Sequence, residues 1–224
     1  MPFRIIEKKL KEPAIPFLCI SRKRIFSAFN SELAKNKKIL FVKSISGYGK
    51  TIAVRKFFLD NQSTLFWYSL DDWDKDPVTF LNYLYQVFKK KIPGIPDKLE
   101  EYFSQPLNSD SLLKSFIGQL SNELEARLKE NSFLILDNFQ EIQNEEVILK
   151  IISFLFSYCP DNLKIIILSN SSLPKAFYPF YLKQELYELE QDFLFLEEDE
   201  ATEIFDKLNL DNPQLQQELL KASN

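Results

Sequence analysis

Short apolar runs alternate with amphipathic stretches along most of this chain. The apolar runs predict buried strands at residues 39–42, 64–70, 133–136, 164–168 and 185–189. Apolar residues at helical spacing predict helices over 22–34, from about residue 50 to beyond 58, from 77 to about 91, and over 109–129, 145–158 and 197–208. Strands that alternate with helices, without hairpin signals, favour an α/β fold with a mostly parallel five-stranded sheet between helices.

The connection between the first strand and the next helix has the pattern of a phosphate-binding loop. It reads Ser44-Ile-Ser-Gly-Tyr-Gly-Lys-Thr51 and contains two of the four glycines of the chain. Glycines let consecutive N–H groups turn inward beside a helix N-terminus, which together bind phosphate. Lys50 is expected to reach the outer phosphates and Thr51 to ligate Mg²⁺. The residues expected to contact the nucleotide are Ser46, Gly47, Tyr48, Gly49, Lys50, Thr51 and Ile52. The full motif G-x-x-x-x-G-K-[ST] has glycine where this chain has Ser44.

A second candidate group follows the strand at 133–136. Asp137 occupies the place of the acid that holds Mg²⁺ opposite the loop threonine, so Thr51 and Asp137 are the predicted metal ligands. Asn138 stands where many such ATPases carry a second acid, and an amide can orient water but cannot act as a base. Glu141 is the nearest substitute. A polar group just past the fourth strand could sense the outermost phosphate, and Asn170 or Ser169 occupies that place.

The remaining stretches suggest a division of the chain into three parts. The prolines in residues 1–20 predict an extended arm. The P-loop nucleotide-binding domain is expected to span residues 21–192. The start of a truncated helical subdomain is expected at residues 193–224, with a helical stub at 214–222. Ser21 and Asp76 are expected to cap helices. The acidic cluster at 71–76 lacks the spacing of a calcium loop and is interpreted as a strand-end loop. The stretch between the fourth and fifth strands is interpreted as a proline-containing loop.

Composition narrows the function. The chain has no histidine and only two cysteines, which excludes histidine-dependent triads and histidine-containing zinc sites. No apolar run is long enough to cross a membrane, and the N-terminus lacks a signal-peptide core, so we expect a cytoplasmic protein without membrane contact. Residues 1–60 carry 14 Lys/Arg and 4 Asp/Glu, whereas the rest carries 14 and 28. The basic part leads into the phosphate loop and shows no DNA-recognition pattern, which argues against direct DNA binding.

These motifs together resemble a known family. The phosphate loop, the segment from Phe66 through Pro77 to Leu84, and the segment 134–142 (Leu-Ile-Leu-Asp-Asn-Phe-Gln-Glu-Ile) look like the STAND-class ATPase domain of MalT-like, LuxR-type transcription regulators. That family accepts a small residue at the position of Ser44. The resemblance covers roughly residues 9–208 and implies an ATP or ADP switch with Mg²⁺, self-association through the ATPase domain of the full-length protein, and DNA binding only through a separate C-terminal domain. Asn138 and Asn170 depart from the acid and arginine common there.

Three readings remain for the function. The first is a nucleotide-operated signalling switch with slow hydrolysis at most. The second is a P-loop ATPase of a defence or metabolic system that couples hydrolysis to work, which the missing second acid disfavours. The third is a scaffold with a vestigial loop, which the presence of Lys50, Thr51 and Asp137 disfavours.

Overall fold

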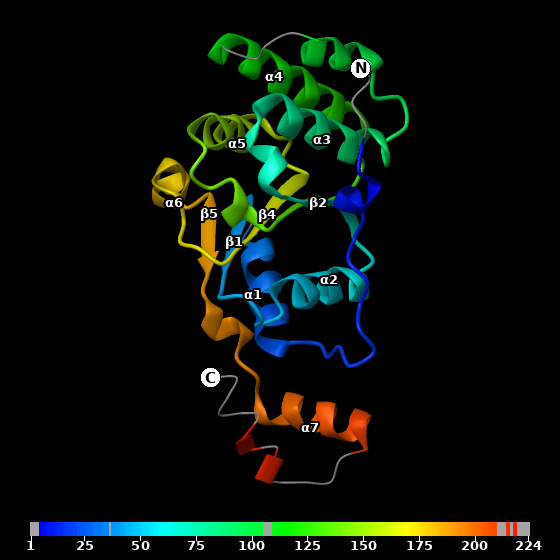
Figure 1. The fold of residues 1–224 in the computed structure, drawn as a ribbon, viewed down its shortest axis with the longest axis vertical. Coiled ribbons are helices and arrows are strands. Elements are labelled where there is room, and N and C mark those ends of the chain that lie inside the picture. The colour runs from blue at the N-terminus through cyan, green and yellow to red at the C-terminus, as the bar shows by residue number, and fades with distance from the viewer. Residues whose placement is uncertain (1–4, 36, 105–108, 210–213, 216, 219–224) are drawn as a thin grey trace.

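Five parallel strands form the centre of the computed structural model, which describes residues 5–35, 37–104, 109–209, 214–215 and 217–218 (Figure 1). The strands are β1 (Ile39–Lys43), β2 (Thr64–Ser69), β3 (Ser132–Asp137), β4 (Leu163–Ser169) and β5 (Leu186–Leu189). They lie in the order β2-β3-β4-β1-β5, and every pair is parallel. The predicted five-stranded sheet is therefore confirmed, and all the carboxyl ends of its strands lie along one edge.

Helices cover both faces of the sheet (Figure 1). One layer consists of α1 (Lys23–Ala34) and α2 (Lys50–Asp60), and the other contains α3 (Pro77–Lys89), α4 (Asp110–Arg127) and α5 (Glu146–Tyr158). Strand β1 shows why both layers form, because its alternate side chains enter different cores. Ile39 and Phe41 belong to the core on the α3–α5 side, whereas Leu40 and Val42 pack with residues of α1 and α2. A continuous apolar run is what a strand covered on both faces requires.

Of the two predicted N-terminal helix caps, Asp76 is confirmed and Ser21 is not. The Asp76 side chain accepts a hydrogen bond from the Thr79 N–H at 2.8 Å and caps α3, with Pro77 as the first helical residue. The predicted cap by Ser21 is wrong. Helix α1 starts at Lys23 after Arg22, and the Ser21 hydroxyl instead donates to Asp60 at 3.2 Å.

Two predicted loops contain helical turns. Residues 72–75 form a 3₁₀ turn capped by Asp71, and the stretch 170–184 contains the short helix α6 (Tyr178–Leu182), with Pro179 in its first turn. Proline lacks an N–H, and the first turn of a helix does not need one, so Pro179 is compatible with α6, which was not predicted.

The described part of the N-terminal arm, residues 5–20, begins beside the edge strand β2 and α3. It contains a short 3₁₀ helix, Glu7–Leu10, so its description as entirely extended is wrong. The Lys9 ammonium is buried and bonds to Asp74 at 2.7 Å and Asp71 at 2.9 Å, while the Ile6 N–H donates to the Tyr83 hydroxyl at 3.0 Å. Within the acidic cluster at the end of β2, Asp74 is 0% exposed, whereas Asp72 and Asp76 are exposed.

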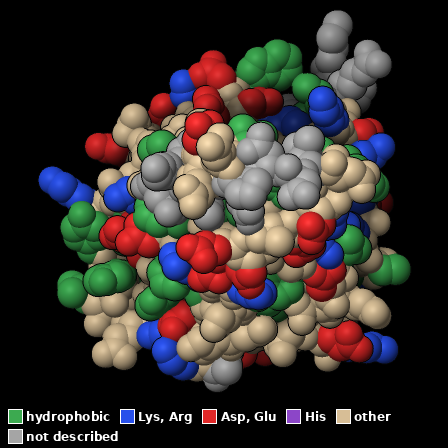
Figure 2. Space-filling view, turned by 90° about the horizontal axis from the view of Figure 1, so that it is seen from below, with side chains coloured by type: hydrophobic (Ala, Val, Ile, Leu, Met, Phe, Trp, Pro, Cys, Tyr) green, Lys and Arg blue, Asp and Glu red, His purple; other side chains and the backbone are tan. Residues whose placement is uncertain are grey.

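Helix α7 (Glu198–Leu208) lies apart from the sheet, beyond α1 (Figure 1). Ion pairs join its N-terminal turn to the start of α1: Arg24 bonds to Glu197 at 2.6 Å, Arg22 lies 3.3 Å from Glu200, and Lys23 pairs with Asp199. Figure 2 shows this end of the molecule, where acidic and basic side chains lie side by side. In the predicted stub at 214–222, residues 214, 215, 217 and 218 are helical and the others lie outside the described residues. No helix of the described part is long and apolar enough to cross a membrane.

Candidate functional site

The loop between β1 and α2 has the conformation that its glycines predict. Gly47 and Gly49 have φ angles of 95° and 77°, in the region where a side chain is strained. Ser44 does not need this freedom. Its N–H donates to the Ser169 carbonyl at 3.1 Å, which extends the pairing of β1 with β4 by one residue. Replacement of the motif's first glycine by serine therefore fits this backbone without a positive φ.

Lys50 is the first residue of α2, and its side chain folds back over the loop. Its ammonium donates to the main-chain carbonyls of Ser44 at 2.8 Å and Ile45 at 3.3 Å. Burial lowers the pKa of Lys50, and the nearby Asp137 carboxylate acts in the opposite direction. A positive charge is thereby held inside the loop, where it adds to the attraction that backbone N–H groups at a helix N-terminus exert on phosphate.

Asp137 lies at the carboxyl end of β3, separated from β1 by the intervening strand β4. The N-terminus of α2 spans that gap, so the Thr51 hydroxyl donates to Asp137 Oδ1 at 3.0 Å. The same oxygen accepts the Asn138 N–H at 3.0 Å. Burial raises the pKa of Asp137, while the bonds from Thr51 and Asn138 and the charge of Lys50 oppose this. Hydroxyl and carboxylate oxygens are ligands that Mg²⁺ accepts, so this pair fits the predicted metal-binding role.

A cavity of about 230 Å³ lies between the loop and the ends of β3 and β4. It is lined by Ser46, Gly47, Gly49, Lys50, Thr51, Asn138, Gln140 and Asn170. Most of the residues singled out in the sequence thus meet at one place. Four of the candidate residues do not line it. Asp137 is buried and bonds to the lining residue Thr51, and the Tyr48 ring lies 6.2 Å from that of Phe195. Ile52 is half-buried in the first turn of α2, and Glu141 is exposed.

Gln140 lines the cavity although the sequence did not single it out. Asn138 has a φ of 59°, a left-handed conformation that asparagine tolerates better than most residues. The chain then makes a 3₁₀ turn over Phe139–Glu141, in which Phe139 is buried and Gln140 faces the cavity. The left-handed backbone at Asn138 turns the chain so that residue 140, and not residue 141, lines the cavity.

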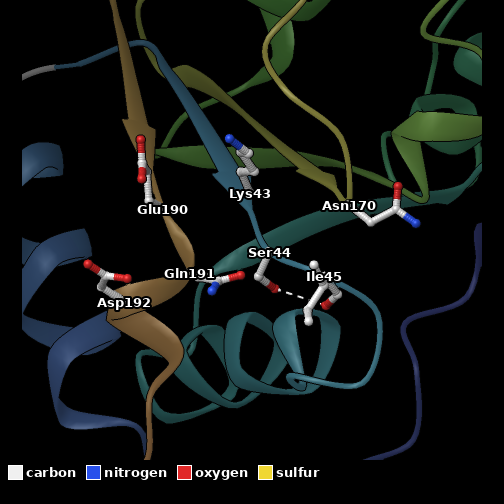
Figure 3. Close-up of a pocket in the computed structure, with 7 residues that line it drawn as sticks. All are labelled: Lys43, Ser44, Ile45, Asn170, Glu190, Gln191 and Asp192. Atoms are coloured by element: carbon white, nitrogen blue, oxygen red, sulfur yellow. Dashed lines mark hydrogen bonds between the residues drawn. The ribbon is translucent and has the colours of Figure 1, made fainter. Parts of the chain in front are cut away.

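A second, smaller cavity of about 170 Å³ adjoins the first (Figure 3). Its lining comes from the ends of β1 and β4 and from the segment after β5: Lys43, Ser44, Ile45, Asn170, Glu190, Gln191 and Asp192. Asn170 lines both cavities. The site at the loop is therefore contiguous with the connection that leads through the 3₁₀ turn η6 (Gln191–Leu194) to α7.

Within the described residues, no group of three or more His, Cys, Asp or Glu side chains could hold a metal ion. A site with only Thr51 and Asp137 as protein ligands suits Mg²⁺, which keeps several waters and binds largely through substrate phosphates.

Strand, glycine loop, helix and distal carboxylate, arranged across a parallel sheet, define a P-loop NTPase fold. The chain belongs to the family described as "Nephrocystin 3, N-terminal", whose model matches residues 23–170. It is also similar to the HTH-type transcriptional regulator MalT of Vibrio cholerae serotype O1, with 27% identity over 202 residues that cover 90% of this chain and 22% of that protein. MalT of Serratia proteamaculans is 30% identical with the same coverage. The predicted resemblance to MalT-like ATPase domains is thus confirmed, and the chain spans about a fifth of the length of these curated relatives.

A solved structure supports the fold. The Walker-type ATPase PABY2304 of Pyrococcus abyssi superposes with a TM-score of 0.51 and 17% identity, covering 94% of this chain and 64% of that one. At this identity the likeness shows the fold alone.

Proposed function

We propose that this chain binds ATP or ADP with Mg²⁺ and acts as the nucleotide-operated switch of a signal-transducing transcription regulator. The observation that carries the proposal is the bond from Thr51 to Asp137, which links the start of α2 to the end of β3 beside the Lys50 ammonium. Loop N–H groups and Lys50 would bind the phosphates, and the Thr51 and Asp137 oxygens would hold Mg²⁺.

The site is better suited to binding than to rapid hydrolysis. Three neutral amides, Asn138, Gln140 and Asn170, line the cavity opposite the loop. Asp137 is already engaged by Thr51 and Asn138, and neither a second acid nor an arginine is among the lining residues. Amides can orient a water molecule but cannot accept its proton, so hydrolysis is expected to be slow.

Replacement of Asn138 by aspartate tests this explanation of slow turnover. Residue 138 is exposed and lines the cavity, so a carboxylate there would lie beside the Mg²⁺ ligands and could polarise water. We expect Asn138→Asp to raise single-turnover ATP hydrolysis about tenfold or more, which is below the roughly 10²–10⁴-fold that a well-positioned general acid or base contributes. Nucleotide affinity should change only a few-fold.

Melting temperatures of the two proteins control for altered folding, since aspartate also tolerates a left-handed conformation. An unchanged rate in a folded, nucleotide-binding variant would show that turnover is limited by something other than the missing acid.

The regulatory part of the proposal rests on the relatives, which are named as HTH-type transcriptional regulators. We propose that DNA is contacted by another part of a longer, cytoplasmic protein, and that residues 21–192 form the nucleotide-binding domain from which this part is controlled. In this proposal residues 193–224 begin a helical subdomain, and the ATPase domains of full-length proteins self-associate. A defence or metabolic ATPase is the alternative, and the neutral amides around the cavity argue against it.

If the domain acts as a switch, the bound nucleotide must alter the segment η6, which connects β5 to α7. The Tyr48 ring of the loop lies 6.2 Å from Phe195, and Gln191 and Asp192 line the cavity that shares Asn170 with the loop site. Amide hydrogen exchange in η6 and α7 should therefore differ between the ADP complex and the complex with a non-hydrolysable ATP analogue. Helix α4, which lies on the other face of the sheet from α1 and α2, serves as the internal control. Identical exchange in η6 and α7 with both nucleotides would contradict the switch while leaving nucleotide binding intact.

A further inference from the structure

Gln140 connects the ends of two strands beside the loop. Its side-chain oxygen accepts a hydrogen bond from the Asn170 backbone N–H at 3.3 Å. Gln140 follows β3 and Asn170 follows β4, so the bond joins neighbouring strands at the carboxyl edge of the sheet. Gln140 is half-buried, and both residues line the 230 Å³ cavity.

This bond fixes the orientation of the Gln140 amide. A backbone N–H can only donate, so the acceptor must be the carboxamide oxygen and not its nitrogen. The NH₂ group, with two donors, has no hydrogen-bond partner in the part of the chain that the structure describes. Gln140 thus presents unused donors in a cavity whose opposite wall is a phosphate-binding loop.

The cavity has two unlike walls. Ser46, Gly47, Gly49, Lys50 and Thr51 form the loop wall, which supplies the positive charge, and the Lys50 ammonium lies close to the backbone of Ser44 and Ile45. Asn138, Gln140 and Asn170 form the wall across from it. A diphosphate held by the loop needs only the first wall, whereas a third phosphate has to extend toward the second.

We propose that the Gln140 carboxamide is the positioning and discriminating group for the terminal phosphate, so that it sets the preference of this site for a nucleoside triphosphate over a diphosphate. This inference rests on the proposed nucleotide-binding function. An amide donor adds a hydrogen bond to a phosphate oxygen without the repulsion that a carboxylate would cause. The bond to Asn170 holds the side chain in the required orientation before the nucleotide arrives.

Two substitutions separate this role from a simple brace between β3 and β4. Gln140→Ala removes both the NH₂ group and the bond to Asn170, whereas Gln140→Glu keeps an oxygen acceptor for the Asn170 N–H and replaces the donors with negative charge. The measurement is isothermal titration calorimetry of Mg²⁺–ADP and of a Mg²⁺–ATP analogue with a non-hydrolysable β–γ bridge. Asn144→Ala, at an exposed residue four positions further along that does not line the cavity, is the matched control.

In both variants we expect the affinity for the ATP analogue to fall about tenfold, the loss of one hydrogen bond to a charged group. Gln140→Glu should be the weaker binder of the two. Affinity for ADP should stay within about twofold, and Asn144→Ala should match the unmodified protein with both nucleotides.

Equal losses for ADP and the analogue in both variants, or no loss for either, would overturn the assignment. Normal analogue affinity in Gln140→Glu alone would also overturn it, because that variant retains only the brace. If the unmodified chain binds neither nucleotide, the proposed function itself fails. That outcome is distinguishable from a failure confined to Gln140, in which the unmodified protein binds both.

Discussion

Replacement of Lys50 by alanine is expected to reduce the affinity for both Mg²⁺–ATP and Mg²⁺–ADP by about a hundredfold or more, a free-energy loss of about 3 kcal/mol. The Lys50 ammonium donates hydrogen bonds to the carbonyls of Ser44 and Ile45 in the loop. Among the described residues that line the cavity, Lys50 is the one lysine. Its removal takes away the main point charge on the phosphates. The measurement is calorimetric titration of the purified variant with each nucleotide.

Lys56→Ala is the matched control for this experiment. Lys56 lies on the same helix α2, six residues further along, and forms an ion pair with Asp60 at 2.7 Å away from the cavity. Loss of this charge should leave nucleotide affinity unchanged and cost little stability, because surface ion pairs contribute roughly 0–1 kcal/mol. Similar affinities in the Lys50 and Lys56 variants would contradict the location of the phosphate site.

The largest effect on stability is expected at Lys9. Its ammonium bonds to the fully buried Asp74 at 2.7 Å and lies 4.3 Å from the centre of the Tyr83 ring. Asp74 also accepts a hydrogen bond from the Tyr68 hydroxyl at 2.5 Å. Burial raises the pKa of Asp74 even though the hydrogen bonds of Lys9 and Tyr68 act in the opposite direction. Without Lys9 the buried carboxylate would keep its hydrogen bond from Tyr68 but lose the positive charge beside it. Lys9→Ala should therefore lower the free energy of unfolding by about 3–5 kcal/mol.

Urea denaturation of Lys9→Ala and Lys8→Ala measures this effect. Lys8 is adjacent and exposed, so its removal should change the free energy of unfolding by less than about 0.5 kcal/mol. The double variant Lys9→Met/Asp74→Leu removes both charges and should recover a substantial part of the loss. A cost below about 1 kcal/mol for Lys9→Ala would show that the arm does not contribute through this ion pair.

The parts of the fold and site that depend on local order along the chain could be predicted from the sequence. The apolar run before the loop, the glycines and Lys-Thr occur in one continuous stretch, so β1, the loop and α2 follow from neighbouring residues. Asp137 was predictable because an apolar strand that ends in an acid has a known place in such a sheet.

Most of the features that the sequence did not reveal depend on contacts between distant segments, and one depends on a single backbone angle. The partner of Lys9 is Asp74, 65 positions away, and no local pattern in the acidic cluster indicates that one of its carboxylates is buried. Arg22 precedes α1 and lies beside Glu200 of α7, a contact that periodicity in residues 21–34 cannot show. Gln140 enters the site through the left-handed conformation of Asn138, a single backbone angle that polar or apolar character does not specify.

The most direct test of the central claim is calorimetric titration of the unmodified chain with ADP and with a non-hydrolysable ATP analogue, with Mg²⁺ present and after its removal by a chelator. We predict one nucleotide bound per chain and clearly weaker binding without Mg²⁺, since Thr51 and Asp137 would hold the ion against the phosphates. Absence of binding to either nucleotide, in a protein shown to be folded by its cooperative thermal unfolding, would contradict the assignment of this cavity as a nucleotide site.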